Sequence, residues 1–168
     1  MQCCGCGVEF GDQDGPTHAY MLSSPGCWAV YGQVLAREYQ DPAYFEIHRL
    51  TVDTYAVHHP GIDVPQARNS VGIHLSRLCL SLDRGWRLRE IDAVMDAISG
   101  KVRSYPWLTP PVTRAPLSVA DVLSAATPGE HRERVSQWAQ AVWENWREHH
   151  DTVRGWNAAL PRPGIPKR

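Results

Sequence analysis

The sequence predicts an all-α protein, a helical bundle of about five to six helices with an N-terminal zinc-knuckle-like loop. Three observations predict this class. From residue 25 onward, apolar side chains recur at helical spacing, and serine, aspartate or threonine followed directly by proline begins several of these segments. Strand-like alternation is not found beyond the N-terminal loop. With 168 residues and 43% hydrophobic content, the chain is long enough to bury one core.

We expect a single helical domain over residues 1–160, in which residues 1–27 form the zinc knuckle and join the first helix. The tail, residues 161–168, is predicted to be flexible. Before residue 24, glycine, proline and aspartate are too frequent for a helix. Ser24 and Pro25 then match an N-cap and a first helical residue, which predicts a helix over residues 25–39.

The next helix repeats this start signal. Asp41 and Pro42 are again a capping residue followed by a first-turn proline. Helical periodicity continues until Pro60, which lacks the N–H that a helix interior needs. The pattern therefore predicts a helix over residues 42–58.

Two more helices are predicted in the middle of the chain. A loop that contains Pro65 separates the first of them from the preceding helix, and Ser70 is its expected N-cap. Its apolar positions reach Leu82. The second begins near Arg87, and Gly100 is its expected C-terminal cap.

The last third of the chain begins with a proline-rich connector over residues 105–116. A short helix is expected from Ser118 to about Ala126. Thr127 and Pro128 then supply an N-cap and a first-turn proline for the longest predicted helix, whose apolar stripe continues to the tryptophan at position 156.

Charge and hydropathy exclude several classes of function. The net charge is −1 and the two signs are interleaved, so the sequence offers no basic stripe for nucleic acid. No run approaches the roughly 20 apolar residues of a membrane span, and the N-terminus does not resemble an export signal. We therefore expect a cytoplasmic protein that binds neither nucleic acid nor membrane.

The N-terminal cysteines predict a zinc site. Cys3 and Cys6 form a Cys-x2-Cys pair in a glycine-rich turn, which aims two thiolates at one point. His18 and Cys27 are the expected third and fourth ligands, and a helix N-terminus favours the Cys27 thiolate. Alternatives are a surface turn with reduced cysteines, a redox Cys-x2-Cys pair, or Cys4 in place of Cys3.

Several segments together resemble a family of uncharacterised bacterial proteins without an assigned function. The resemblance extends over most of the chain. In this family a proline tends to stand where this chain has Cys4, which makes Cys4 the least favoured ligand. The segments that carry the resemblance are CGCG at 4–7 preceded by Cys3, GPTHAYM at 15–21, SPGCW at 24–28, HRLTVD at 48–53, HPG at 59–61 and HHDTVR at 149–154.

The eight histidines suggest a second site. His149 falls on the apolar stripe of the last helix and is expected to point into the core, and His74 lies at the edge of another apolar face. On the second helix, His48 and His59 share one face, and periodicity does not decide whether it points inward. Together with Asp53, these histidines could form a catalytic metal or acid–base pocket between helices. The competing interpretation is that they are hydrogen-bonded core or capping residues.

Tryptophans are the remaining prominent feature of the last predicted helix. Most are expected in the core, but Trp143 lies about a quarter-turn off the apolar stripe. It is the best candidate for a partner surface, so we consider a homo-oligomer formed through exposed tryptophans.

Two functions remain open. The first, which we favour, is a zinc-stapled helical module that binds an unidentified protein or small molecule and catalyses nothing itself. The second is a metal-dependent enzyme, a hydrolase or a transferase, that uses the interhelical histidines.

Overall fold

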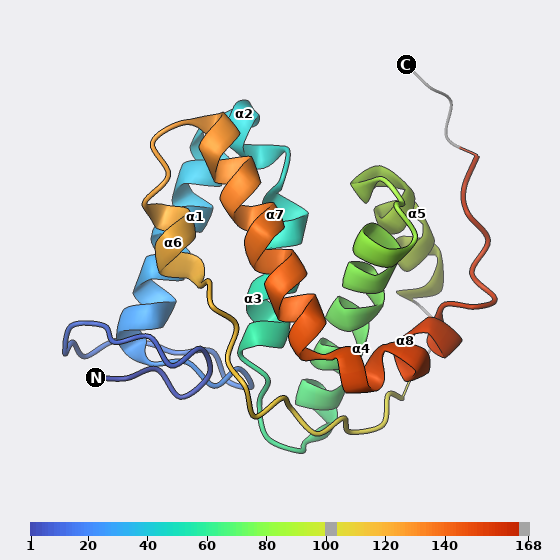
Figure 1. Ribbon diagram of the computed structural model, residues 1–168, viewed down its shortest axis with the longest axis horizontal. Coiled ribbons are helices and arrows are strands. Elements are labelled where there is room, and N and C mark those ends of the chain that lie inside the picture. Colours follow the sequence, from blue (N-terminus) through green and yellow to red (C-terminus); the bar gives the residue numbers. More distant parts are fainter. Residues whose placement is uncertain (100–103, 165–168) are drawn as a thin grey trace.

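The computed structural model describes residues 1–99 and 104–164, which fold into eight α-helices and no β-strand (Figure 1). The predicted all-α class is confirmed. The helices outnumber the predicted five to six because two predicted helices are each divided into two. The helices are α1 (Pro25–Gln40), α2 (Pro42–Phe45), α3 (His48–His58), α4 (Pro65–Leu78), α5 (Leu88–Ser99), α6 (Val119–Leu123), α7 (Pro128–Asn145) and α8 (His150–Trp156).

Helix α3 is the central helix of the bundle. It packs against α1, α4 and α7 (Figure 1), and nine of its eleven residues are buried. Periodicity left open which face of this helix points inward, and the answer is that both do. His48 and Tyr55 on one face, like Leu50 and His58 on the other, are at most 7% exposed.

The predicted helix over residues 42–58 is interrupted at Glu46 and Ile47, which separate α2 from α3. The start signal itself is as predicted, because the Asp41 carboxylate accepts a hydrogen bond from the first turn of α2. The interruption redirects the chain so that α3 enters the core, where the His48 side chain reaches Glu38 of α1.

The predicted start of α4 is wrong. The helix begins at Pro65, and Ser70 lies inside it instead of capping it. Proline suits the first helical position, because its missing N–H would have no partner there and its φ is already helical. A wider, π-helical turn over Cys79–Asp83 extends α4. The Gly100 cap proposed for α5 lies outside the described residues.

The last predicted helix bends after α7. A single 3-10 turn, Arg147–His149, separates α7 from α8 and changes the direction in which the following side chains point. His149 is therefore partly exposed and hydrogen-bonds to the Thr109 carbonyl, so its predicted core position is wrong. His150 is the buried residue instead, stacked 3.8 Å from the Trp143 ring.

Three tryptophans of this region fill the core around α3. Trp138, Trp143 and Trp146 are each at most 1% exposed, so the expectation that Trp143 lies on a partner surface is wrong. Each buried indole N–H has an acceptor, as burial of tryptophan requires. The acceptors are His58 Nδ1 at 3.0 Å for Trp138, Asp83 Oδ1 at 3.1 Å for Trp143 and the Val57 carbonyl at 3.2 Å for Trp146.

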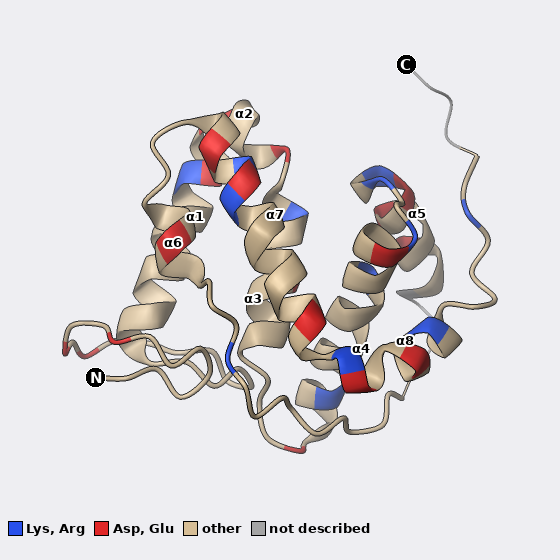
Figure 2. Ribbon diagram, in the orientation of Figure 1, with Lys and Arg blue, Asp and Glu red and all other residues tan. Residues whose placement is uncertain are grey.

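Charged residues of both signs are interspersed along the helices (Figure 2). In the part of the chain that the structure describes, no helix combines the length and apolarity that crossing a membrane requires. Of the tail predicted over residues 161–168, only 161–164 are described, and Arg162 there forms an ion pair with Glu90 at 2.8 Å.

Candidate metal centre

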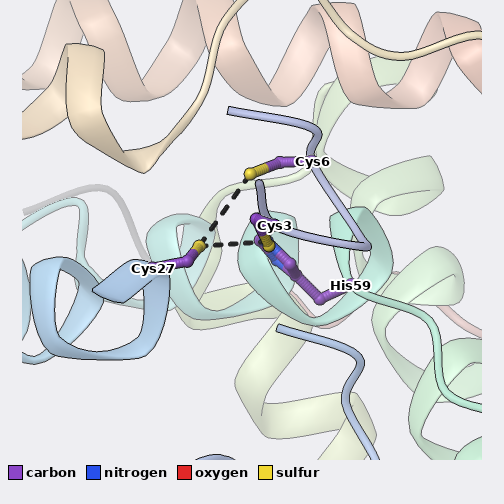
Figure 3. A group of neighbouring side chains, drawn as sticks. All are labelled: Cys3, Cys6, Cys27 and His59. Carbon is purple, nitrogen blue, oxygen red and sulfur yellow. Dashed lines mark hydrogen bonds between the residues drawn. The ribbon is translucent and has the colours of Figure 1, made fainter. Parts of the chain in front are cut away.

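Four side chains converge where the N-terminal loop meets the start of α1 and the end of α3. They are Cys3, Cys6, Cys27 and His59, and their donor atoms all lie within 4.8 Å of one another (Figure 3). Each of the four residues is at most 3% exposed. Among the described residues this is the single such group of His, Cys, Asp or Glu side chains. The group could hold a metal ion.

The loop that carries the first two cysteines is a tight turn. The Gly7 N–H donates to the Cys3 carbonyl at 2.8 Å, and Gly7 has a φ of +77°, which favours glycine. At Gly5 the constraint is proximity, since an added Cβ would lie 2.4 Å from the His59 ring. The glycines flanking Cys6 therefore serve two purposes, to close the turn and to bring it against His59.

Cys27 is positioned by the cap of α1. The Ser24 hydroxyl accepts a hydrogen bond from the Cys27 N–H at 3.2 Å, as the Ser-Pro signal predicts. The Ser24 N–H donates in turn to Cys3 Sγ at 3.4 Å. One capping residue thus fixes the helix start and stabilises a sulfur of the cluster.

His59 follows the last residue of α3. Its Nδ1–H donates to the Tyr55 carbonyl at 3.0 Å, which leaves Nε2 free to ligate. Nε2 lies 3.3 Å from Cys27 Sγ. Metal-binding histidines usually have their second nitrogen oriented in this way by a carbonyl or a carboxylate.

The spacing of the donor atoms suits a tetrahedral metal. Zinc–sulfur bonds of about 2.3 Å and zinc–nitrogen bonds of about 2.0–2.1 Å place tetrahedral ligands roughly 3.8 Å (S to S) and 3.6 Å (S to N) apart. Cys6 Sγ and Cys27 Sγ are 3.9 Å apart, close to that value, and Cys27 Sγ and His59 Nε2, at 3.3 Å, lie slightly closer than a bound ion would hold them. A disulfide would need about 2.0 Å, and all five cysteines are free.

The three thiols also compete electrostatically. Hydrogen bonds from Cys27 and Cys6 lower the pKa of the Cys3 thiol. The bonds to Cys3 and Cys6, together with burial, raise the pKa of Cys27. For Cys6, the hydrogen bond to Cys27 lowers the pKa of the thiol. The contact with Cys3 and burial outweigh this bond and raise the pKa to about 11. By itself the cluster favours one thiolate, whereas a bound divalent cation would stabilise all three.

A family model matches residues 1–147, which include all four residues of the candidate metal centre. The chain belongs to DUF5946, a family of unknown function. This agrees with the resemblance of the sequence to an uncharacterised family. No curated protein and no solved structure matches the chain.

The structure groups a different histidine with the three cysteines. His18 does not belong to the group in this DUF5946 protein; its ring packs against Tyr20 and Trp28, with centroids 4.3 and 5.3 Å away. His59 takes its place from 32 residues beyond Cys27, because α3 packs so that its C-terminal end meets the start of α1. Sequence spacing favoured the nearer histidine and carried no signal for this tertiary contact.

The other predicted site residues do not meet at one point. His48 hydrogen-bonds to Glu38 at 2.7 Å, and His74 hydrogen-bonds to Asp53 at 2.8 Å. Asp53 is also paired with a buried arginine, Arg77, at 2.9 Å. With His149 at a loop carbonyl, the expected pocket of interhelical histidines does not form among the described residues.

Proposed function

We propose that this protein binds one zinc ion through Cys3, Cys6, Cys27 and His59. The observation that carries the proposal is the convergence of four buried donor atoms within 4.8 Å, with the His59 ring oriented by a backbone carbonyl. Three thiolates and one imidazole are a common ligand set for structural zinc. In a reducing environment, clustered cysteines without disulfides also favour a metal.

The zinc has a structural role. A catalytic zinc keeps one position open for water or substrate, whereas the four buried side chains here would fill all four positions of a tetrahedral ion. The ligands come from three segments, the N-terminal loop, the start of α1 and the end of α3. The ion joins a loop with little regular structure to the centre of the bundle.

The protein as a whole is a zinc-stapled helical module that binds a ligand. The alternative of a metal-dependent enzyme depends on a second, open site built from the interhelical histidines. Those histidines are each engaged in separate hydrogen bonds, to Glu38, Asp53 and the Thr109 carbonyl. This arrangement favours the binding module.

Elemental analysis of protein purified without chelator tests the zinc proposal. We expect one zinc per chain, retained in Cys4→Ser and lost in Cys27→Ser. Cys4 is a matched control because it is exposed and lies next to a ligand, but is not one of the four. A wild-type protein without metal, or equal zinc content in the two variants, would contradict the proposal.

A further inference from the structure

A pocket of about 230 Å³ lies directly beside the metal centre. Cys4 and Gly5 of the N-terminal loop form one wall, and the residues on both sides of His59 form another. The connector over residues 110–114 and the end of α7 complete it. The pocket is smaller than the roughly 300–1,000 Å³ of drug-sized sites, so it suits a small metabolite.

The connector wall is held in place by side chains of the C-terminal region. The Asn145 amide donates to the Thr113 carbonyl at 3.0 Å. His149 Nε2 donates to the Thr109 carbonyl at 2.9 Å, just before the wall begins. The bond to Thr109 gives His149 a positioning role, and the two bonds together hold this wall of the pocket in place without a ligand.

One of the residues that line this pocket, His58, carries a buried hydrogen-bond donor without a partner among the described residues. His58 lines the pocket and is 7% exposed. Its Nδ1 accepts the Trp138 indole N–H at 3.0 Å, and because an indole nitrogen can only donate, the imidazole proton must be on Nε2. That Nε2 has no hydrogen-bond partner in the described part of the protein. Buried donors are almost always paired, so this one points to a missing acceptor.

A positively charged side chain also lines this pocket. Arg114 is exposed on the connector and lines the pocket. Its guanidinium packs over Gly7, where an added Cβ would lie 2.1 Å from Nη1. Within residues 1–99 and 104–164, no carboxylate forms an ion pair with it. The pocket therefore combines an unpaired positive charge with an unpaired N–H donor.

We propose that the pocket binds a small organic carboxylate, with its negative group at Arg114 and His58 and its apolar part against Val57, Val142 and Trp146. A carboxylate suits both unpaired groups, since guanidinium and imidazole N–H donate well to it, and both residues line the pocket. The inference rests on the proposed function, because the metal centre holds the Cys4–Gly5 wall in place.

A carboxylate could come from a free acid or from the C-terminus of a peptide. We would titrate the zinc-loaded full chain with isovalerate, benzoate and a tetrapeptide with a free C-terminus, and with the amide of each. Two-dimensional NMR would report binding through the indole N–H of Trp146, which lines the pocket. The acids should shift this signal and the amides should not. Binding by the tetrapeptide alone would assign the carboxylate to a peptide.

Substitution of Arg114 is the more decisive test of the pocket. Arg114→Ala should weaken carboxylate binding roughly tenfold or more, the usual cost of losing a charged hydrogen bond. Arg132→Ala is the matched control, because Arg132 is also exposed but pairs with Glu46 away from the pocket. His58→Phe would test the second donor, and since it could disturb the core, the Arg114 comparison decides.

Zinc content, measured on the same samples, separates the two proposals. One zinc per chain without carboxylate binding, or equal affinity in Arg114→Ala and wild type, would overturn the pocket alone. Absence of zinc would overturn the proposed function. Carboxylate binding that depends on Arg114 but not on zinc would keep the pocket and remove its dependence on the metal centre.

Discussion

Two buried polar clusters join α1 to α3, one at each end of the helix pair, and they balance their charge in different ways. At one end is the Cys3, Cys6, Cys27 and His59 group. At the other, the Glu38 carboxylate is fully buried and accepts hydrogen bonds from three side chains. The donors are Thr51 at 2.6 Å, His48 at 2.7 Å and His131 of α7 at 2.9 Å.

The two clusters differ in whether the groups that stabilise the negative charge belong to the cluster itself. Burial raises the pKa of Glu38, but the bonds from His131, His48 and Thr51 outweigh it and hold the pKa below its ordinary value. The carboxylate is therefore stabilised by side chains of its own cluster and requires no bound ion. The cysteine group instead places three thiols together with no cation among them, and their mutual contacts lower the pKa of Cys3 while they raise that of Cys27. This contrast supports the assignment of a metal to the cysteine group, which rests on the convergence of its four donor atoms.

The largest effect that would test this contrast is metal removal. We expect a strong chelator to lower the free energy of unfolding by on the order of 5 kcal/mol or more, because binding energy at a structural zinc is folding energy. Thermal unfolding followed by circular dichroism, with and without chelator, measures it. An unchanged midpoint would show that the cysteine group, like the Glu38 cluster, is complete without an ion.

The next largest effect is expected in the cluster around Glu38. Glu38→Ala should cost about 3–5 kcal/mol, since it leaves buried donors of His48 and His131 unpaired. Denaturant unfolding measures this cost, and zinc content should stay at one per chain. Glu46→Ala is the control, because its ion pair with Arg132 is exposed and should contribute less than about 1 kcal/mol. Similar costs for the two variants would contradict the account.

A smaller effect tests how the loop meets His59. Gly5→Ala should weaken zinc binding by roughly 10–100-fold, the range seen when the surroundings of a ligand are disturbed. The added methyl would collide with the His59 ring at 2.4 Å and with the Leu22 carbonyl at 2.5 Å. Gly11→Ala should leave affinity unchanged, because nothing lies within 4 Å of its added Cβ. Competition with a chromophoric chelator measures both; equal affinities would show that the close approach is not required.

Local signals in the sequence predicted much of the fold. The caps at Ser24, Asp41 and Thr127 each begin a helix as expected, because a side-chain acceptor followed by proline acts within one turn. The start of α4 was missed because Pro65 was interpreted as a loop residue, although it occupies a first turn. The position of His149 was missed because one 3-10 turn changes the phase of everything after it.

The candidate metal centre, like the fold, could be predicted from the sequence only where the signals are local. Cys3 and Cys6 share one turn and Cys27 lies in a capped first turn, so local signals predicted the three cysteines that the structure brings together. The fourth donor depends on how α3 packs against α1, and nothing within a turn of His59 encodes that contact. The same packing places His58 in the lining of the pocket and the next residue, His59, beside the cysteines.

X-ray absorption at the zinc edge, together with the zinc content of His59→Ala and His18→Ala, tests whether these four side chains bind the ion. We expect three sulfurs at about 2.3 Å and one nitrogen at about 2.0–2.1 Å, with zinc retained in His18→Ala and lost or strongly weakened in His59→Ala. A shell with fewer than three sulfurs, or zinc that depends on His18 and not on His59, would contradict this expectation.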